Sequence, residues 1–174
     1  DNGGTAGVKI YNAGMRGGKT SVHEGGSRVP LFMRWPAAKW TPHVAKPIVS
    51  HIDLLPTLLD LCGVKAPDGP KRDGVSLRPL LENEDSSAWP ERTLFTHNPI
   101  DETNKFPGAV RTQRHRLVRE IKGPAGGSKA KANDASATPW QLYDMETDPG
   151  QEKDIAKANP ELVAKLSAAY DAWF

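Results

Sequence analysis

The chain has 174 residues and a mass of 18.9 kDa, which is the size of one ordinary domain or slightly more. Its 23 Lys and Arg against 21 Asp and Glu give a formal charge of +2, a near balance that argues against a dedicated nucleic-acid binder. No apolar run is long enough to span a membrane, and the single cysteine excludes an internal disulfide or a cysteine-based zinc site within this chain. The chain opens on Asp1-Asn2-Gly3-Gly4 without a methionine or a signal peptide, so we expect a fragment or a processed piece of a longer protein.

The first half of the chain predicts ordered loops, one strand and one helix. Residues 1–28 are rich in glycine and poor in apolar side chains, which is typical of ordered loops that let backbone approach a ligand. The apolar run Val29–Trp35 predicts a mostly buried strand that ends at Pro36. A helix follows, because Leu54, Leu55, Leu58, Leu59 and Cys62 fall on one helical face, with Asp53 or Ser50 as its cap and Cys62 as a small core residue. Residues 64–92 predict a long surface connection and a subdomain boundary.

The second half predicts a small antiparallel sheet with one packed helix. Strands are expected at Thr93–Thr96, Ala109–Thr112, Arg116–Ile121 and Gln141–Met145, the middle two forming a hairpin. The low-complexity segment 123–139 predicts a flexible loop. Asn159 and Pro160 predict the start of a final helix that carries an apolar stripe. The arginines of the hairpin could touch an anionic substrate, but a solvated sheet face is the preferred interpretation: Arg111, Arg114, Arg116 and Arg119.

Three short motifs have alternative interpretations when each is taken alone. Residues 13–20 fit a relaxed phosphate-loop pattern, yet they lack a strong preceding strand and a following helix, which disfavours a nucleotide site. Asp1 and Asn2 offer the oxygen ligands that calcium prefers, although most such stretches are plain turns. Lys19 could hold an anionic group as a point charge, although a lone lysine is more often a solvated surface residue.

Taken together and in order, the motifs of this chain resemble the later part of the catalytic domain of arylsulfatase-type sulfatases. The resemblance spans nearly the whole chain, and it is specific because its modest motifs follow one another in the family's order. The motifs are Asp1-Asn2-Gly3-Gly4, Arg16-Gly17-Gly18-Lys19, Glu24-Gly25-Gly26-Ser27-Arg28-Val29-Pro30, Arg34-Trp35-Pro36, the helix 53–59, Asp73-Gly74-Val75-Ser76-Leu77 with Pro79-Leu80-Leu81, Leu142-Tyr143-Asp144 and Asp148-Pro149-Gly150.

The resemblance assigns roles to individual residues. It implies that Asp1 and Asn2 are two calcium ligands and that Lys19 contacts the substrate sulfate. His23 is a weaker catalytic candidate, since a packing histidine is at least as common at such a position. Glu24 and Arg28 are expected to be structural, as partners in a buried ion pair.

The same resemblance implies that part of the catalytic apparatus lies outside this chain. The family's formylglycine nucleophile arises from a Cys-x-Pro/Ala-x-Arg type motif near the N-terminus. Cys62 does not fit that motif, so the nucleophile is expected in an absent N-terminal portion, and this chain alone should be inactive.

The sequence therefore predicts an α/β, alkaline-phosphatase-like sulfatase fold. Residues 1–92 would be the end of the catalytic domain, and residues 93–174 a small C-terminal subdomain. The expected reaction is hydrolysis of a sulfate ester, and the expected partners are a sulfated small molecule or sulfated glycan and the rest of the catalytic domain. By resemblance, the protein is periplasmic or secreted. The alternatives are a non-catalytic fragment or binding module, and a related phosphonate or phosphate ester hydrolase, which Asn2 disfavours because those relatives tend to carry His there.

Overall fold

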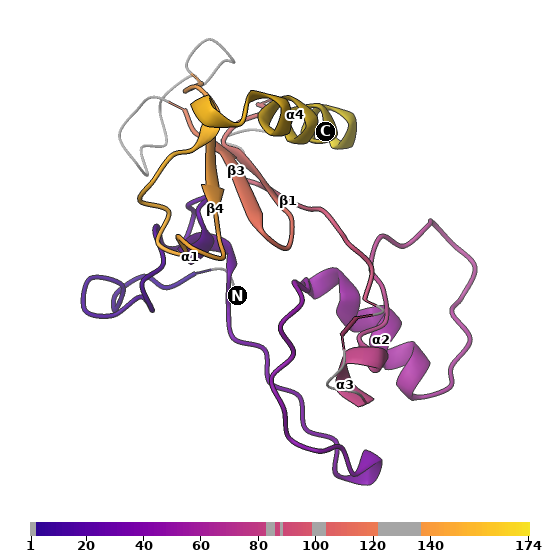
Figure 1. Ribbon diagram of the computed structural model, residues 1–174. Helices are drawn as coiled ribbons and strands as arrows, with labels where there is room; N and C mark the ends of the chain where they lie inside the picture. The colour runs from indigo at the N-terminus through magenta and orange to yellow at the C-terminus, as the bar shows by residue number, and fades with distance from the viewer. Residues whose placement is uncertain (1–2, 83–85, 88, 99–103, 122–136) are drawn as a thin grey trace. The chain divides into compact units, whose positions relative to one another are not determined.

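The computed structural model describes residues 3–82, 86–87, 89–98, 104–121 and 137–174 (Figure 1). The chain forms two compact units, one of residues up to Leu31 together with Thr93–Phe174, the other of Phe32–Arg92. The predicted division into residues 1–92 and 93–174 concerns domains of a longer protein and stays a prediction. Most of the low-complexity segment 123–139, predicted to be flexible, lies outside the described residues.

The first unit is built on a four-stranded antiparallel sheet in the order β1-β2-β3-β4 (Figure 1). Its strands are β1 (Leu94–His97), β2 (Gly108–Arg111), β3 (His115–Arg119) and β4 (Gln141–Asp144). The short 3-10 turn η4 (Ala156–Ala158) precedes helix α4 (Pro160–Trp173), whose N-cap is Asn159. The predicted strands, the hairpin and the start of the final helix are confirmed.

One face of this sheet packs on α4 and forms an apolar core. Val110, Leu117 and Leu142 stand opposite one another across the three later strands and are fully buried. Tyr170 of α4 joins this cluster, and its hydroxyl donates to the main-chain oxygen of Lys105 at 2.7 Å. Burial raises the pKa of Tyr170 to about 12, so this hydroxyl stays a donor at neutral pH.

The opposite face of the sheet is covered by the glycine-rich N-terminal segment. Because side chains alternate along a strand, Ala109, Val118 and Tyr143 point away from α4, and they form a second buried cluster with Val22. The short helix α1 (Glu24–Ser27) follows Val22 directly. The sheet is therefore packed between α4 on one face and the glycine-rich segment on the other, although that segment lies more than 60 residues before β1 in the sequence.

The second unit holds two short helices and the irregular segments around them. Its elements are η1 (Pro36–Ala38), η2 (His51–Asp53), α2 (Leu54–Leu61) and α3 (Arg78–Glu82). The Asp53 carboxylate is buried and accepts hydrogen bonds from Arg92 at 2.7 and 3.0 Å, from Val75 N at 3.0 Å and from Ser50 N at 2.7 Å. Burial alone would raise the pKa of Asp53, but these donors outweigh it and lower the pKa below its usual value.

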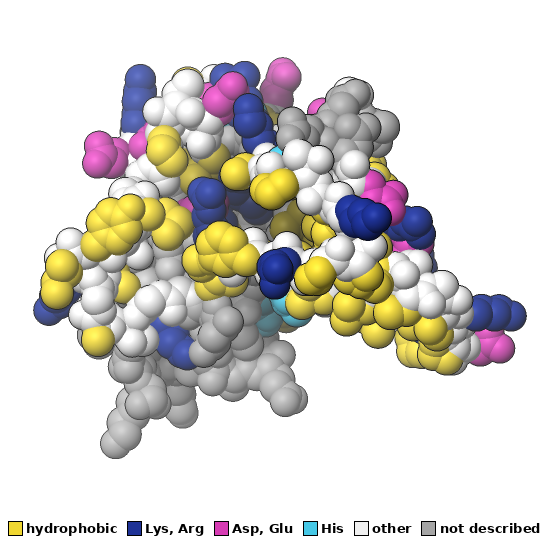
Figure 2. Space-filling model, turned by 90° about the horizontal axis from the view of Figure 1, so that it is seen from below, with side chains coloured by type: hydrophobic (Ala, Val, Ile, Leu, Met, Phe, Trp, Pro, Cys, Tyr) yellow, Lys and Arg dark blue, Asp and Glu magenta, His cyan; other side chains and the backbone are white. Residues whose placement is uncertain are grey.

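Several large apolar side chains stand on the surface, and Figure 2 shows hydrophobic groups over much of the face in view. Phe32 is 92% exposed and no strand forms at Val29–Trp35, so the predicted buried strand is wrong for this chain. A strand needs a hydrogen-bonded neighbour, and this segment has none among the described residues. Leu55 and Leu58 of α2 are half exposed, and Cys62, predicted to be a core residue, is exposed. None of the described helices is long and apolar enough to cross a membrane.

Candidate functional site

The glycine-rich segment folds into a tight loop around Lys19. Lys19 N donates to Gly4 O at 2.9 Å, and Gly25 N donates to Arg16 O at 2.8 Å. A Cβ on Gly3 would lie 2.8 Å from Lys19 N and 2.6 Å from Gly25 O, so only glycine permits this approach. The loop therefore brings Lys19 beside the residues that follow Asn2 in the chain.

The residues predicted from the sequence to bind metal and sulfate are described only in part. Lys19 is exposed and lies in the turn that the hydrogen bond from Ser21 N to Gly18 O closes. Asp1 and Asn2 lie outside the described residues. Among the residues that the structure does describe, no three or more His, Cys, Asp or Glu side chains gather in a way that could hold a metal ion. The calcium assignment therefore stays a prediction that rests on Asp1 and Asn2.

His23, the weaker catalytic candidate, lies inside the first unit and not at its surface. The ring is 2% exposed and meets the Tyr143 ring edge-on. Its Nδ1 lies 3.1 Å from Nε2 of Gln151, and its Nε2 lies 3.5 Å from the Glu120 carboxylate. The contact with His23 is the main cause that lowers the pKa of Glu120. The histidine thus belongs to a polar network beneath the loop.

A buried ion pair joins the loop to the sheet. The Glu24 carboxylate is 2.8 Å from Nη1 of Arg116 on β3 and 3.3 Å from Nε of Arg111 on β2. Arg116 is 2% exposed, so the predicted solvated sheet face is wrong at this position. The predicted partner Arg28 also lies within ion-pair distance of Glu24, at 3.8 Å, but its side chain is 66% exposed, so the predicted burial of this pair is wrong on the Arg28 side. Burial lowers the pKa of Arg116 to about 10, which leaves the guanidinium charged at neutral pH.

Gln151 is a second link between the loop and the sheet, and sequence reasoning missed it. The residue is fully buried, follows β4, and has a positive φ of 55°. Its Oε1 accepts from Glu24 N at 2.8 Å, and its main-chain oxygen accepts from Nη1 of Arg16 at 3.2 Å. The one recognisable motif beside it in the sequence is the turn Asp148-Pro149-Gly150. This turn predicts a change of chain direction before Gln151 but gives no indication of the residues that Gln151 contacts.

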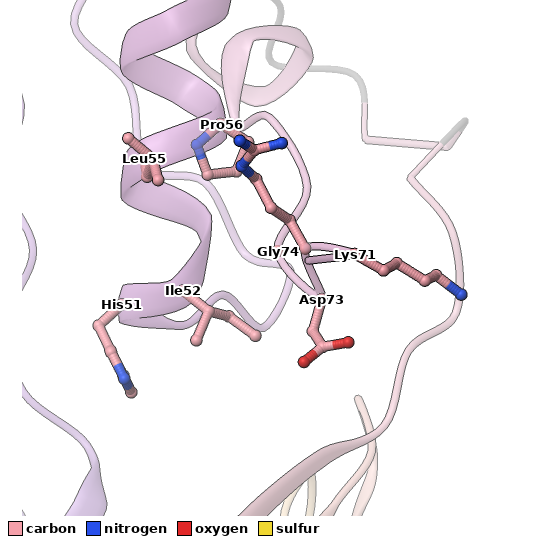
Figure 3. A pocket seen from close by; sticks show the side chains of 8 residues that line it. His51, Ile52, Leu55, Pro56, Lys71, Asp73 and Gly74 are labelled. Atoms are coloured by element: carbon pink, nitrogen blue, oxygen red, sulfur yellow. The ribbon is translucent and has the colours of Figure 1, made fainter. Parts of the chain in front are cut away.

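The second unit contains a pocket of about 320 Å³ (Figure 3). Figure 3 shows that the Lys71 side chain extends away from the other labelled groups, so the polar groups do not converge on one point. None of the residues predicted to carry catalysis or binding lines it. The lining residues are His51, Ile52, Leu55, Pro56, Lys71, Arg72, Asp73 and Gly74.

Comparison with known sequences shows a family match that covers most of this chain, including the loop from residue 18 onward. The sequence profile of the family described as "N-sulphoglucosamine sulphohydrolase, C-terminal" matches residues 18–169. Arylsulfatase A of Homo sapiens is 31% identical over 163 residues, which cover 87% of this chain and 31% of the human protein. N-acetylgalactosamine-6-O-sulfatase of Bacteroides thetaiotaomicron is 28% identical over 152 residues, which cover 87% of this chain and 28% of that protein. The chain thus spans about 30% of the length of these two relatives.

Comparison with solved structures gives the same picture for the fold. Ps i-CgsB, solved in complex with k-i-k-neocarrahexaose, matches with a TM-score of 0.71 and 26% sequence identity. The match covers 99% of this chain and 34% of that one. Nearly all of the chain therefore corresponds to one part of a larger protein of known fold.

Proposed function

We propose that this chain, which belongs to the sulfatase family and corresponds to its C-terminal portion, forms part of an enzyme that hydrolyses sulfate esters. Membership and the α/β, alkaline-phosphatase-like fold follow from the family match over residues 18–169 and from the structural likeness. The observation that carries the proposal is that this match includes Lys19 and the Glu24–Arg28 motif, which the structure folds into one tight loop.

Lys19 is proposed to contact the sulfate group. It is exposed in a turn whose neighbouring residues are held by buried contacts, so the backbone that carries its ammonium is ordered before substrate binds. A cation placed beside the sulfuryl oxygens would offset charge that grows on them and on the leaving oxygen during hydrolysis. Lysine suits this task because its ammonium is a compact point charge with several donors.

Asp1 and Asn2 are proposed to supply two oxygen ligands of a calcium ion. Carboxylate and amide oxygens are the ligands that this hard cation prefers, and such an ion supplies Lewis-acid polarisation of a sulfate oxygen when it is bound. Lys19 N is hydrogen-bonded to Gly4 O, two residues after Asn2 in the chain, which supports a common site for the cation and the sulfate. The formylglycine nucleophile is proposed to lie in sequence that precedes this portion.

The substrate class is proposed to be a sulfated glycan. Two similar proteins support this choice, one named as an N-acetylgalactosamine-6-O-sulfatase and one solved with a neocarrahexaose. The rest of the catalytic domain is the proposed partner of this chain. Leu55 and Leu58 support it, because both stand half exposed three residues apart on α2, and apolar side chains on one helix face are typical of a surface that another part of a protein covers.

The proposal is tested on the full-length protein with a pair of chromogenic substrates that differ only in the ester. We expect hydrolysis of 4-nitrophenyl sulfate with much slower hydrolysis of 4-nitrophenyl phosphate, and loss of activity on chelation that calcium restores. Release of inorganic sulfate from a sulfated polysaccharide would extend the result to the proposed substrate class. Preference for the phosphate ester would instead support the related hydrolase, and no hydrolysis of either ester would support a non-catalytic binding role.

A further inference from the structure

We propose that Gln151 and Arg116 are positioning residues for Lys19. Both belong to the C-terminal part of the chain, and both hold the glycine-rich loop through fully buried polar contacts. The inference rests on the proposed function, because it concerns the lysine that is proposed to contact sulfate. The C-terminal sheet bears none of the predicted metal or sulfate ligands. The proposal adds that this sheet nevertheless sets the position of the predicted sulfate ligand, Lys19.

Gln151 holds the loop on both sides of Lys19. Its main-chain oxygen accepts from Arg16, three residues before the lysine, at 3.2 Å. Its side-chain oxygen accepts from Glu24 N, five residues after the lysine, at 2.8 Å, and its amide nitrogen lies 3.1 Å from Nδ1 of His23. A buried residue whose main-chain oxygen holds one end of a loop and whose side chain holds the other end fixes the span of that loop.

Arg116 holds the far end of the same loop from the middle of the sheet. Its guanidinium donates to Val22 O at 2.5 and 3.1 Å, to the Glu24 carboxylate at 2.8 Å and to Ser27 Oγ at 2.8 Å. These contacts use all three of its nitrogens on one short stretch of chain. A planar guanidinium that is committed to several fixed acceptors leaves the segment little freedom to shift.

Hydrogen bonds within the loop transmit this constraint to Lys19. Gly25 N is bonded to Arg16 O at 2.8 Å, and Ser21 N is bonded to Gly18 O at 2.9 Å, so the residues on either side of the lysine form a closed turn. Nη1 of Arg16 also donates to the Tyr143 hydroxyl at 2.9 Å. Movement at Gln151 would therefore release Arg16 and Glu24, the residues that hold the turn that contains Lys19.

The experiment is a double-mutant cycle in the full-length enzyme, read as kcat/KM on 4-nitrophenyl sulfate. Gln151→Met keeps the length of the side chain and removes its side-chain hydrogen bonds to Glu24 N and His23, and it should lower kcat/KM by about tenfold, the scale expected when buried partners are left unpaired. The same change in a Lys19→Ala background should cost less than about twofold, because residues that act through one another are not additive. Gln141→Met on β4 is the matched control, since Gln141 makes none of these loop contacts, and it should cost less than about twofold in either background.

Each outcome supports or overturns the inference. Equal loss from Gln151→Met in both backgrounds would overturn it while leaving the proposed function intact, because the residue would then act on general stability. No loss from Lys19→Ala itself would refute the role of the lysine, and with it this inference. If Lys19→Ala falls below detection, the affinity for inorganic sulfate replaces kcat/KM in the same cycle. If Gln151→Met does not fold, Gln151→Glu takes its place, because it keeps a side-chain oxygen and removes only the amide nitrogen that lies 3.1 Å from Nδ1 of His23.

Discussion

Replacing Arg116 by methionine should destabilise the sheet and the loop together. The change removes the closest partner of Glu24, whose side chain is only 6% exposed, and leaves a carboxylate in a buried site. Breaking a buried pair in this way costs about 3–5 kcal/mol. Because Arg111 remains 3.3 Å from Glu24, we expect the lower end, about 3 kcal/mol.

Hydrogen exchange of the β2 and β3 amides in the full-length protein measures this cost locally. A loss of about 3 kcal/mol corresponds to roughly 100-fold faster exchange through local opening. Arg114→Met is the matched control, because the Arg114 side chain is 58% exposed and surface pairs contribute only about 0–1 kcal/mol. The double variant Arg116→Met with Glu24→Gln should recover part of the protection, since no buried charge is then left without a partner. Equal exchange in the Arg116→Met and Arg114→Met proteins would refute the reasoning.

Three further predictions concern the loop, the core and acid stability. A Cβ on Gly26 would lie 1.9 Å from a backbone oxygen, so Gly26→Ala should lower the free energy of unfolding by about 1–3 kcal/mol or more, measured by thermal unfolding. Gly7 has open space around it, so the control Gly7→Ala should change this free energy by less than about 0.5 kcal/mol. Tyr170→Phe should cost about 1 kcal/mol in the same assay, because a buried carbonyl loses its donor. The hydrogen bond from Arg114 lowers the pKa of Asp144 to about 2. The ionised Asp144 therefore stabilises the folded protein fully above pH ~4, and this contribution is lost as the pH falls through about 2. Asp144→Asn should therefore be less stable at pH 7 and lose less stability than the unmodified protein between pH 4 and 2.

The sheet and the last helix could be predicted because their signals are local. Alternating residues of β2 and β3 and the short turn between them specify a hairpin, and Asn159-Pro160 specifies the start of α4. The failure at Val29–Trp35 has a physical reason, because an apolar run becomes a strand only where another strand is available to pair with it. This chain offers no such partner among the residues that the structure describes.

The burial of Arg116 and Gln151 could not be predicted because it depends on distant contacts. Alternation places Arg116 and Val118 on the same face of β3, but the group that covers this face comes from residues 94 positions earlier. Gln151 stands in a polar segment and meets the loop 127 positions away. The residues of the candidate site, by contrast, came from a family resemblance, and the fold of their loop follows from glycines that allow a close backbone approach.

The most direct test of the central claim is the activity of Lys19→Ala in the full-length protein, measured as kcat/KM on 4-nitrophenyl sulfate beside Lys9→Ala. Lys9 is an exposed lysine of the same glycine-rich segment and controls for the loss of a positive charge. Removal of a group that stabilises transition-state charge costs about 100- to 1,000-fold, so we expect that loss for Lys19→Ala and no loss for Lys9→Ala. Full activity in the Lys19→Ala protein would contradict the assignment of the loop as the sulfate-binding wall of a sulfatase site.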